Sequence, residues 1–247
     1  MSNKERPIIF SAPMVRALLS GEKTQTRRAM KLKPHQQIEE RDDGAPRPWM
    51  YDNERDADVW LACPYGQPGD RLWVRETFQY RGASYDGHGI DESEWFRCYG
   101  AGGAADNWDP DYPHGWWPTP HMNVKKLDAA DEQEGEGVTG WVTKRIPGIH
   151  MPRWASRITL EVTSVRVERL NDISESDCWA EGIEEVMYDF DDAAQIDMPN
   201  RLGCCIEDAK PLYALLWEQI NGKGSWDANP WVWVVEHKRI AQEEGAA

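Results

Sequence analysis

The chain has 247 residues, and its 43 Asp and Glu outnumber its 28 Lys and Arg, which gives a formal net charge of −15. This length corresponds to one large domain or two small ones. The acidic balance makes duplex DNA an unfavourable partner, because a general duplex binder needs many cations to displace counterions from phosphates. Trp is unusually frequent, with 14 copies against 8 Tyr and 4 Phe.

Apolar runs and cysteines place the chain among reduced, cytoplasmic proteins. Every apolar run is far shorter than the roughly 18 residues of a membrane span, so no membrane partner is expected. The first residues lack the pattern of a secretory signal. The 5 Cys have no regular spacing, and Cys204 and Cys205 are adjacent, unlike a C-x-x-C metal pair. We therefore expect no metal site and no cofactor.

The first predicted elements are a short strand over residues 7–10 and a helix from Ser11 to Gly21. Ser is a favourable N-cap, and Gly commonly ends a helix. Residues 31–68 carry several Pro and mixed charge without periodicity, which predicts an irregular connection. Gly69 and Asp70 then form a turn before a strand whose apolar positions alternate up to Phe78.

Residues 79–150 are the least regular part of the sequence. They contain Gly-rich and Asp-rich stretches and several Trp, and show no helix or strand of convincing length. A loop this long in a compact domain is functional or disordered. We predict an insertion that is ordered around its Trp residues and mobile around residues 127–138.

Regular structure is predicted again from about residue 158. The pattern indicates a long strand over 158–167, a short helix capped by Ser174 and Gly182, an irregular acidic stretch over 183–206, a helix over 212–220 and a buried strand over 231–240. Strands separated by irregular loops and a few helices predict an α+β fold, a small mixed β-barrel with helices packed outside it.

The segment GEKTQTRR, residues 21–28, contains the first candidate catalytic groups. The amine of Lys23 can act as a base if burial lowers its pKa. The hydroxyl of Thr26 is a weak nucleophile until a neighbouring base takes its proton. The alternative is an exposed basic segment with no chemical role.

Glu181 is the second candidate, because it ends the short helix in an apolar setting. A helix C-terminus and partial burial both disfavour an ionised carboxylate, which suits a general acid. The alternative is a surface Glu beside a helix cap.

Aromatic and basic side chains in loops form a third candidate group. Trp154 and Trp226 offer flat rings on which a nucleobase stacks, and Arg157 is placed to meet a phosphate. The alternative is that these Trp residues fill the core of a loop-rich protein.

Three segments together resemble the ASCH domain, a branch of the PUA-like β-barrels. They are the helix with G-x-K-x-x-T-x-R, here ending at Arg28; Gly69-Asp70 with the strand LWVRETF; and the long strand with a short helix ending A-E-G, a late helix and the closing strand VWVVEHK. The resemblance implies a single domain over 1–247, with its core at about 7–30, 67–78 and 150–240. The stretches 31–66 and 79–149 are insertions outside this pattern, the second being the large irregular Trp-rich one. The opening segment and the block before the closing strand also look like ASCH proteins of phages and prophages.

A small bacterial ASCH enzyme hydrolyses the amide of N4-acetylcytidine, and its catalytic Lys, Thr and Glu match Lys23, Thr26 and Glu181. The resemblance therefore implies an amidohydrolase acting on an acylated nucleobase or nucleoside. Arg28, the last Arg of the motif, is expected to neutralise the oxyanion or to order Glu181. Asp227, in the loop before the closing strand, is expected to reach the same cleft.

Two other functions are left open by the sequence. Other ASCH and PUA-like domains bind RNA without catalysis, so the chain could be a non-catalytic RNA or modified-base binding module. It could also be a phage accessory protein that binds a host protein in the host cytoplasm. A modified nucleoside or nucleobase is the expected partner, with RNA as the alternative.

Overall fold

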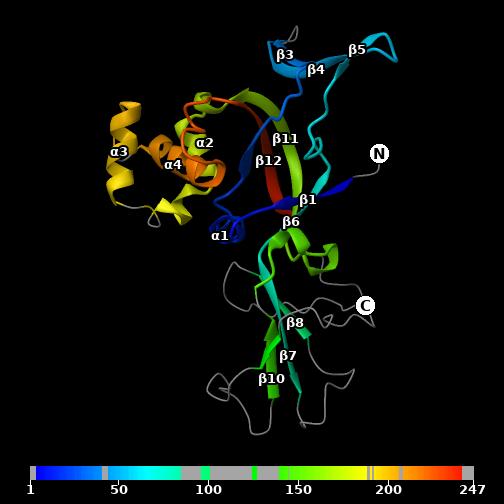
Figure 1. The fold of residues 1–247 in the computed structure, drawn as a ribbon, viewed down its shortest axis with the longest axis vertical. Helices are drawn as coiled ribbons and strands as arrows, with labels where there is room; N and C mark the ends of the chain where they lie inside the picture. The colour runs from blue at the N-terminus through cyan, green and yellow to red at the C-terminus, as the bar shows by residue number, and fades with distance from the viewer. Residues whose placement is uncertain are drawn as a thin grey trace. The chain divides into compact units, whose positions relative to one another are not determined.

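The computed structural model describes residues 4–40, 44–84, 96–100, 124–126, 139–143, 145–187, 190, 192–205 and 208–240. These ranges contain both helices and strands (Figure 1), and the predicted α+β class is confirmed.

The largest sheet has five strands in the order β1-β6-β11-β12-β2. Their bounds are Glu5–Ile9 for β1, Arg71–Arg75 for β6, Thr159–Arg169 for β11, Trp231–Ile240 for β12 and Gln25–Ala29 for β2. The predicted strands before Phe78, over 158–167 and over 231–240 are confirmed, and the first strand begins two residues earlier than predicted. Alternating apolar side chains such as Leu72 and Val74 are buried, as the pattern required.

Within the described ranges, four α-helices accompany this sheet: α1 (Ala12–Ser20), α2 (Glu175–Ala180), α3 (Asp192–Leu202) and α4 (Ala209–Asn221). Short 3-10 helices lie at Gly148–His150, Arg153–Ala155, Leu170–Asp172 and Ile183–Glu185. Helix α4 packs against both α2 and α3, and Figure 1 shows the three helices on one side of β11 and β12. The predicted helices ending at Gly21, Gly182 and Gly222 are confirmed.

The predicted irregular connection over 31–68 is wrong, because this segment forms a three-stranded antiparallel sheet. Its strands are β3 (Gln36–Glu40), β4 (Pro46–Asp52) and β5 (Ala57–Trp60), in the order β3-β4-β5. Most of the β4 and β5 residues are exposed or half-buried. A sheet without one clearly buried face leaves no strict apolar alternation in the sequence.

Residues 79–150 also contain strands that the sequence analysis missed. They are β7 (Phe78–Ser84), β8 (Phe96–Gly100), β9 (Val124–Lys126) and β10 (Thr139–Thr143), paired in the order β8-β7-β10-β9. Ser84 of β7 pairs with Thr139 of β10. The two strands are far apart in the sequence, so no tight-turn motif predicts that they pair. The stretch 127–138, predicted to be mobile, lies outside the described residues.

The predicted irregular stretch over 183–206 is wrong for its second half, where α3 forms. This helix contains Pro199 in its interior and is largely polar. Pro inside a helix and a weak apolar face both disfavour helix assignment from sequence.

The chain divides into two compact units. Unit 1 comprises residues 1–6, 16–72 and 160–241, and unit 2 comprises residues 7–15, 73–159 and 242–247. Unit 1 contains the β3-β4-β5 sheet and helices α2 to α4, while unit 2 contains the β8-β7-β10-β9 sheet. Among the residues that the structure describes, no helix is both long enough and apolar enough to cross a membrane. The single-domain organisation implied by the resemblance stays a prediction.

Candidate functional site

Lys23 is held in the turn between α1 and β2 by backbone hydrogen bonds. Its own N–H donates to Ala17 O at 3.0 Å, and the following N–H, of Thr24, donates to Ala180 O at 2.9 Å. The Thr24 carbonyl accepts from the N–H of His237 on β12 at 2.8 Å. The turn is therefore fixed to α1, α2 and β12, and the Lys23 side chain is buried at this junction.

The Lys23 amine contacts Glu181 twice. Lys23 Nζ donates to Glu181 Oε2 at 2.8 Å and to the Glu181 carbonyl oxygen at 2.8 Å. Glu181 is the C-cap of α2, whose N-terminus is capped by Ser174 Oγ accepting from the Asp177 N–H. The two side chains are 2% and 4% exposed. The structure thus brings together two of the three predicted catalytic residues in a nearly dry environment.

Gly182 permits this close approach. It has φ +78°, and a Cβ atom there would lie 2.7 Å from Ala17 Cβ and 3.0 Å from Lys23 Cβ. Any larger residue would push the end of α2 away from the α1–β2 turn. The Gly that ends α2 therefore also sets the position of Glu181 beside Lys23.

The guanidinium that contacts Glu181 belongs to Arg27. Arg27 Nη1 donates to Glu181 Oε1 at 3.2 Å, and its Nε and Nη2 reach Glu168 and Asp177. The expectation that Arg28 orders Glu181 stays a prediction, and Arg27, the neighbouring residue on the other face of the strand, makes the printed contact. Arg27, Asp177 and Glu168 were missed by the sequence analysis. Asp177 could have been predicted from its spacing, because a residue four positions before Glu181 lies on the same face of the helix.

Burial dominates the electrostatics of this cluster. Desolvation lowers the pKa of Lys23 from its ordinary value of 10.5, and the nearby Glu181 carboxylate opposes that shift. Desolvation, with a contribution from Lys23, lowers the pKa of His237 to about 3. Desolvation and the negative charge of Glu181 raise the pKa of Tyr213, on α4, well above 10. A lowered pKa increases the fraction of the amine that is neutral, and so able to accept a proton, near neutral pH.

Thr26 and Arg28 lie on the face of β2 opposite to Arg27. In the antiparallel ladder with β12, Thr26 is opposite Val235 and Arg28 is opposite Trp233. Thr26 is buried and Arg28 is half-buried. A contact between Thr26 and Lys23 stays a prediction.

Trp226 and Asp227 occupy different environments in unit 1. Trp226 is 1% exposed and packs edge-on against Tyr213, with ring centroids 6.2 Å apart. Its burial favours the packing alternative, because a base needs an accessible ring face for stacking. The Asp227 side chain is 62% exposed, with Oδ1 3.5 Å from Arg201 Nη2.

Trp154 and Arg157 belong to unit 2. Trp154 is half-buried in the 3-10 helix Arg153–Ala155. Arg157 forms a two-point contact with Glu76, at 2.8 Å from Nε to Oε1 and 3.2 Å from Nη2 to Oε2. Glu76 is buried, and a buried carboxylate needs such a partner. The Arg157 guanidinium therefore neutralises the Glu76 carboxylate within unit 2.

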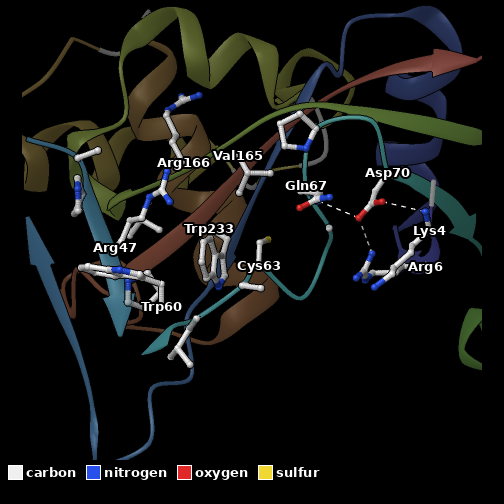
Figure 2. A pocket seen from close by; sticks show the side chains of 18 residues that line it. Lys4, Arg6, Arg47, Trp60, Cys63, Gln67, Asp70, Val165, Arg166 and Trp233 are labelled. Atoms are coloured by element: carbon white, nitrogen blue, oxygen red, sulfur yellow. Dashed lines mark hydrogen bonds and ion pairs between the residues drawn. The ribbon is translucent and has the colours of Figure 1, made fainter. Parts of the chain in front are cut away.

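A cavity of about 700 Å³ lies elsewhere in unit 1. Figure 2 shows that its wall includes Arg47 and Trp60 of the three-stranded sheet, Trp233 of β12, and Lys4 and Arg6 at the start of the chain. Its volume falls within the range of small-molecule sites, about 300–1,000 Å³. None of the predicted site residues, all of which the structure describes, lines it.

No protein-family model, curated protein or solved structure matches this chain. Within the part of the chain that the structure describes, no group of three or more His, Cys, Asp or Glu side chains is arranged to hold a metal ion.

Proposed function

We propose that the chain hydrolyses the amide of an acylated nucleobase or nucleoside of the N4-acylcytidine type. The observation that carries the proposal is the buried contact between Lys23 Nζ and Glu181 Oε2 at 2.8 Å. These residues stand at the positions where the ASCH-like motif and the short helix were expected to supply a base and an acid. The same resemblance supports a PUA-like barrel for the core and a cytoplasmic location.

In the proposed reaction, Lys23 in its neutral form takes the proton of the Thr26 hydroxyl, and Oγ1 attacks the acyl carbonyl carbon. Glu181 gives a proton to the leaving N4 nitrogen as the C–N bond breaks, which releases the free base and leaves an acyl-Thr ester. Water then hydrolyses the ester and returns the Thr26 hydroxyl. Arg28 is proposed to neutralise the oxyanion that forms in each step.

The electrostatic environment supports these roles. The lowered pKa of Lys23 favours its neutral, proton-accepting form. Arg27 binds the other oxygen of Glu181 through Nη1 at 3.2 Å, so it is a positioning residue that orients the proposed acid. Tyr213 keeps its proton because of its raised pKa, and it adds no further negative charge to the cluster.

The test is a screen of N4-acylated cytidines and related modified nucleosides with the full chain, followed by mass spectrometry of the products. Lys23→Met and Thr26→Ala should each abolish turnover. The double variant should be little slower than either single variant, because residues that act as one unit are strongly non-additive. Thr24→Ala is the matched control, since Thr24 is exposed and lies in the same motif.

Two outcomes would change the proposal. Substantial turnover by Thr26→Ala would reject a covalent Thr and leave Lys23 activating water directly. Absence of turnover across the whole screen would favour the second candidate, a non-catalytic module that binds RNA or a modified base. That candidate is favoured by one observation: Lys23 and Arg27 are already ion-paired, Lys23 with Glu181 and Arg27 with Glu168, Asp177 and Glu181.

A further inference from the structure

The cavity beside the three-stranded sheet has an unusual charge for this chain. Its 18 lining residues include four basic residues and one acidic residue. The whole chain has the opposite balance, with 28 basic and 43 acidic residues. A positively charged cavity in a negatively charged protein favours anionic ligands, because its charge raises the local concentration of ions of opposite sign.

The single carboxylate in the wall, that of Asp70, is already neutralised. Asp70 Oδ1 accepts from the Lys4 N–H at 3.0 Å, and Oδ2 accepts from Arg6 Nη1 at 2.8 Å and from the Gln67 N–H at 3.2 Å. These hydrogen bonds outweigh burial and lower the pKa of Asp70. Asp70 therefore stays ionised and holds Arg6, and it leaves no unscreened negative charge toward the cavity.

Two of the four cations remain for a ligand. The Arg166 guanidinium is bound by Glu168, Asp177 and Glu236, and Arg6 is bound by Asp70. In the described ranges, neither the Lys4 amine nor the Arg47 guanidinium has an ion-pair partner, and both residues are exposed. An exposed guanidinium at a cavity wall suits two-point recognition of a phosphate.

Two indoles complete the site. Trp60, at the end of β5, is 46% exposed, and Trp233, on β12, is half-buried. Figure 2 shows both side chains among those lining the same hollow. Large exposed aromatic rings beside a cavity indicate a ligand that covers them, and indole faces stack on any nucleobase.

We propose that this cavity binds a nucleoside phosphate, with the base against Trp60 and Trp233 and the phosphate against Arg47, which lies beside Trp60 in Figure 2. The volume of about 700 Å³ accommodates one such molecule. Arg47 and Trp60 lie in the segment 31–66, outside the ASCH-like pattern, so the site belongs to this chain's own added sheet. A neighbouring hollow of about 440 Å³ shares Trp233 and Pro48, which gives room for a second nucleotide of a single strand.

The test is calorimetric titration of the full chain with cytidine 5′-monophosphate, cytidine, ribose 5-phosphate and a single-stranded RNA hexamer. The monophosphate should bind saturably with one-to-one stoichiometry, and both cytidine and ribose 5-phosphate should bind more weakly. Arg47→Ala and Trp60→Ala should each weaken binding by about fivefold or more. Arg55→Ala and Tyr51→Ala are the matched controls, and they should leave binding unchanged. Both residues are exposed and lie outside the cavity wall, Tyr51 on β4 and Arg55 in the turn between β4 and β5.

The RNA hexamer shows whether the ligand is a free nucleotide or a nucleotide within a single RNA strand, since both offer the same base and phosphate. Tighter binding of the hexamer, with the same loss in Arg47→Ala and Trp60→Ala, would identify a nucleotide within a strand. Equal or weaker binding would identify a free nucleotide. No saturable binding of any phosphate-bearing probe, or binding that is unchanged in both variants, would overturn the proposal.

This proposal stands apart from the amide hydrolysis proposed above. Lys23→Met removes the proposed base but does not touch the cavity, so it should retain binding of the monophosphate. Loss of binding in a folded Lys23→Met variant would place the ligand at the Lys23–Glu181 cluster and overturn the assignment to this cavity.

Discussion

Lys23 and Glu181 are 158 positions apart in the sequence, yet Lys23 Nζ lies 2.8 Å from Glu181 Oε2. Both side chains are almost fully excluded from water. Removing one partner of such a pair leaves the other charge buried and is far more costly than losing a surface ion pair. The cluster around this pair therefore affects both the stability of unit 1 and the proposed chemistry.

Arg27→Met should lower the free energy of unfolding by about 3–5 kcal/mol, because it leaves the Glu181 carboxylate with one fewer cation in a buried position. The loss of Arg27 destabilises the Glu168 and Asp177 carboxylates less, because their side chains are 20% and 27% exposed and keep contact with water. Urea denaturation followed by far-UV circular dichroism measures the change. Arg55→Met is the control, because its side chain is 73% exposed beside Asp52, and it should cost less than about 1 kcal/mol. Equal losses in the two variants would contradict the prediction.

Gly182→Ala should destabilise the protein and separate Glu181 from Lys23. The new Cβ would lie 2.7 Å from Ala17 Cβ at a residue with φ +78°, so it adds a steric clash to the backbone strain. We expect a loss of about 2–5 kcal/mol, from about 1–2 for the left-handed conformation and about 1–3 for overpacking. Gly203→Ala has φ +67° but no atom within 4 Å of its Cβ, so it should show only the strain. A loss in Gly182→Ala no greater than in Gly203→Ala would mean that the close approach is unimportant.

If the chain is an amidohydrolase, kcat/KM should follow a bell-shaped pH profile, because the mechanism needs one deprotonated and one protonated group. The limb that rises with pH reports the deprotonation of Lys23, whose pKa is lowered by burial. Lys23 and Glu181 are in contact, so the apparent values belong to the pair. Glu181→Gln should remove one limb and lower kcat, whereas the exposed Glu184→Gln should keep the full profile. An unchanged bell in Glu181→Gln would exclude Glu181 from the mechanism.

His237 should make the protein acid-sensitive. Its pKa is about 3 in the folded state, against an ordinary value of 6.5. Between these two pH values the unfolded chain binds a proton that the folded protein does not, so stability falls as pH drops below about 6.5. The contribution of His237 at pH 5 is a loss of about 2 kcal/mol.

His237→Gln tests this assignment by the slope of stability against pH. The variant should lose stability less steeply than the natural chain between pH 7 and 5, whatever its stability at pH 7. Urea midpoints measured across that interval give the slope. His35→Gln changes an exposed His and should leave the slope unaltered. A slope that is the same in His237→Gln and in the natural chain would contradict the assignment.

Local patterns predicted the parts of the fold that depend on neighbouring residues. The alternation before Phe78, the Ser174 cap and the Gly at the end of α2 each involve residues a few positions apart. Capping and strand alternation act over that distance, so these elements were correctly located. The positions of Lys23 at one turn and Glu181 at one helix end followed from the same signals.

Tertiary structure decided which of these groups meet. The contact of Arg27 with Glu181 depends on which face of β2 lies toward α2, and a strand with polar residues on both faces does not reveal that face. The β3-β4-β5 sheet lacks a clearly buried face, and Ser84 pairs with Thr139 across a long separation, so neither left a pattern in the sequence. The burial of Trp226 against Tyr213 and the basic cavity at Trp60 and Trp233 arise in the same way. Each requires segments far apart in the chain to be packed together, and that packing is a property of the folded molecule and not of any local stretch.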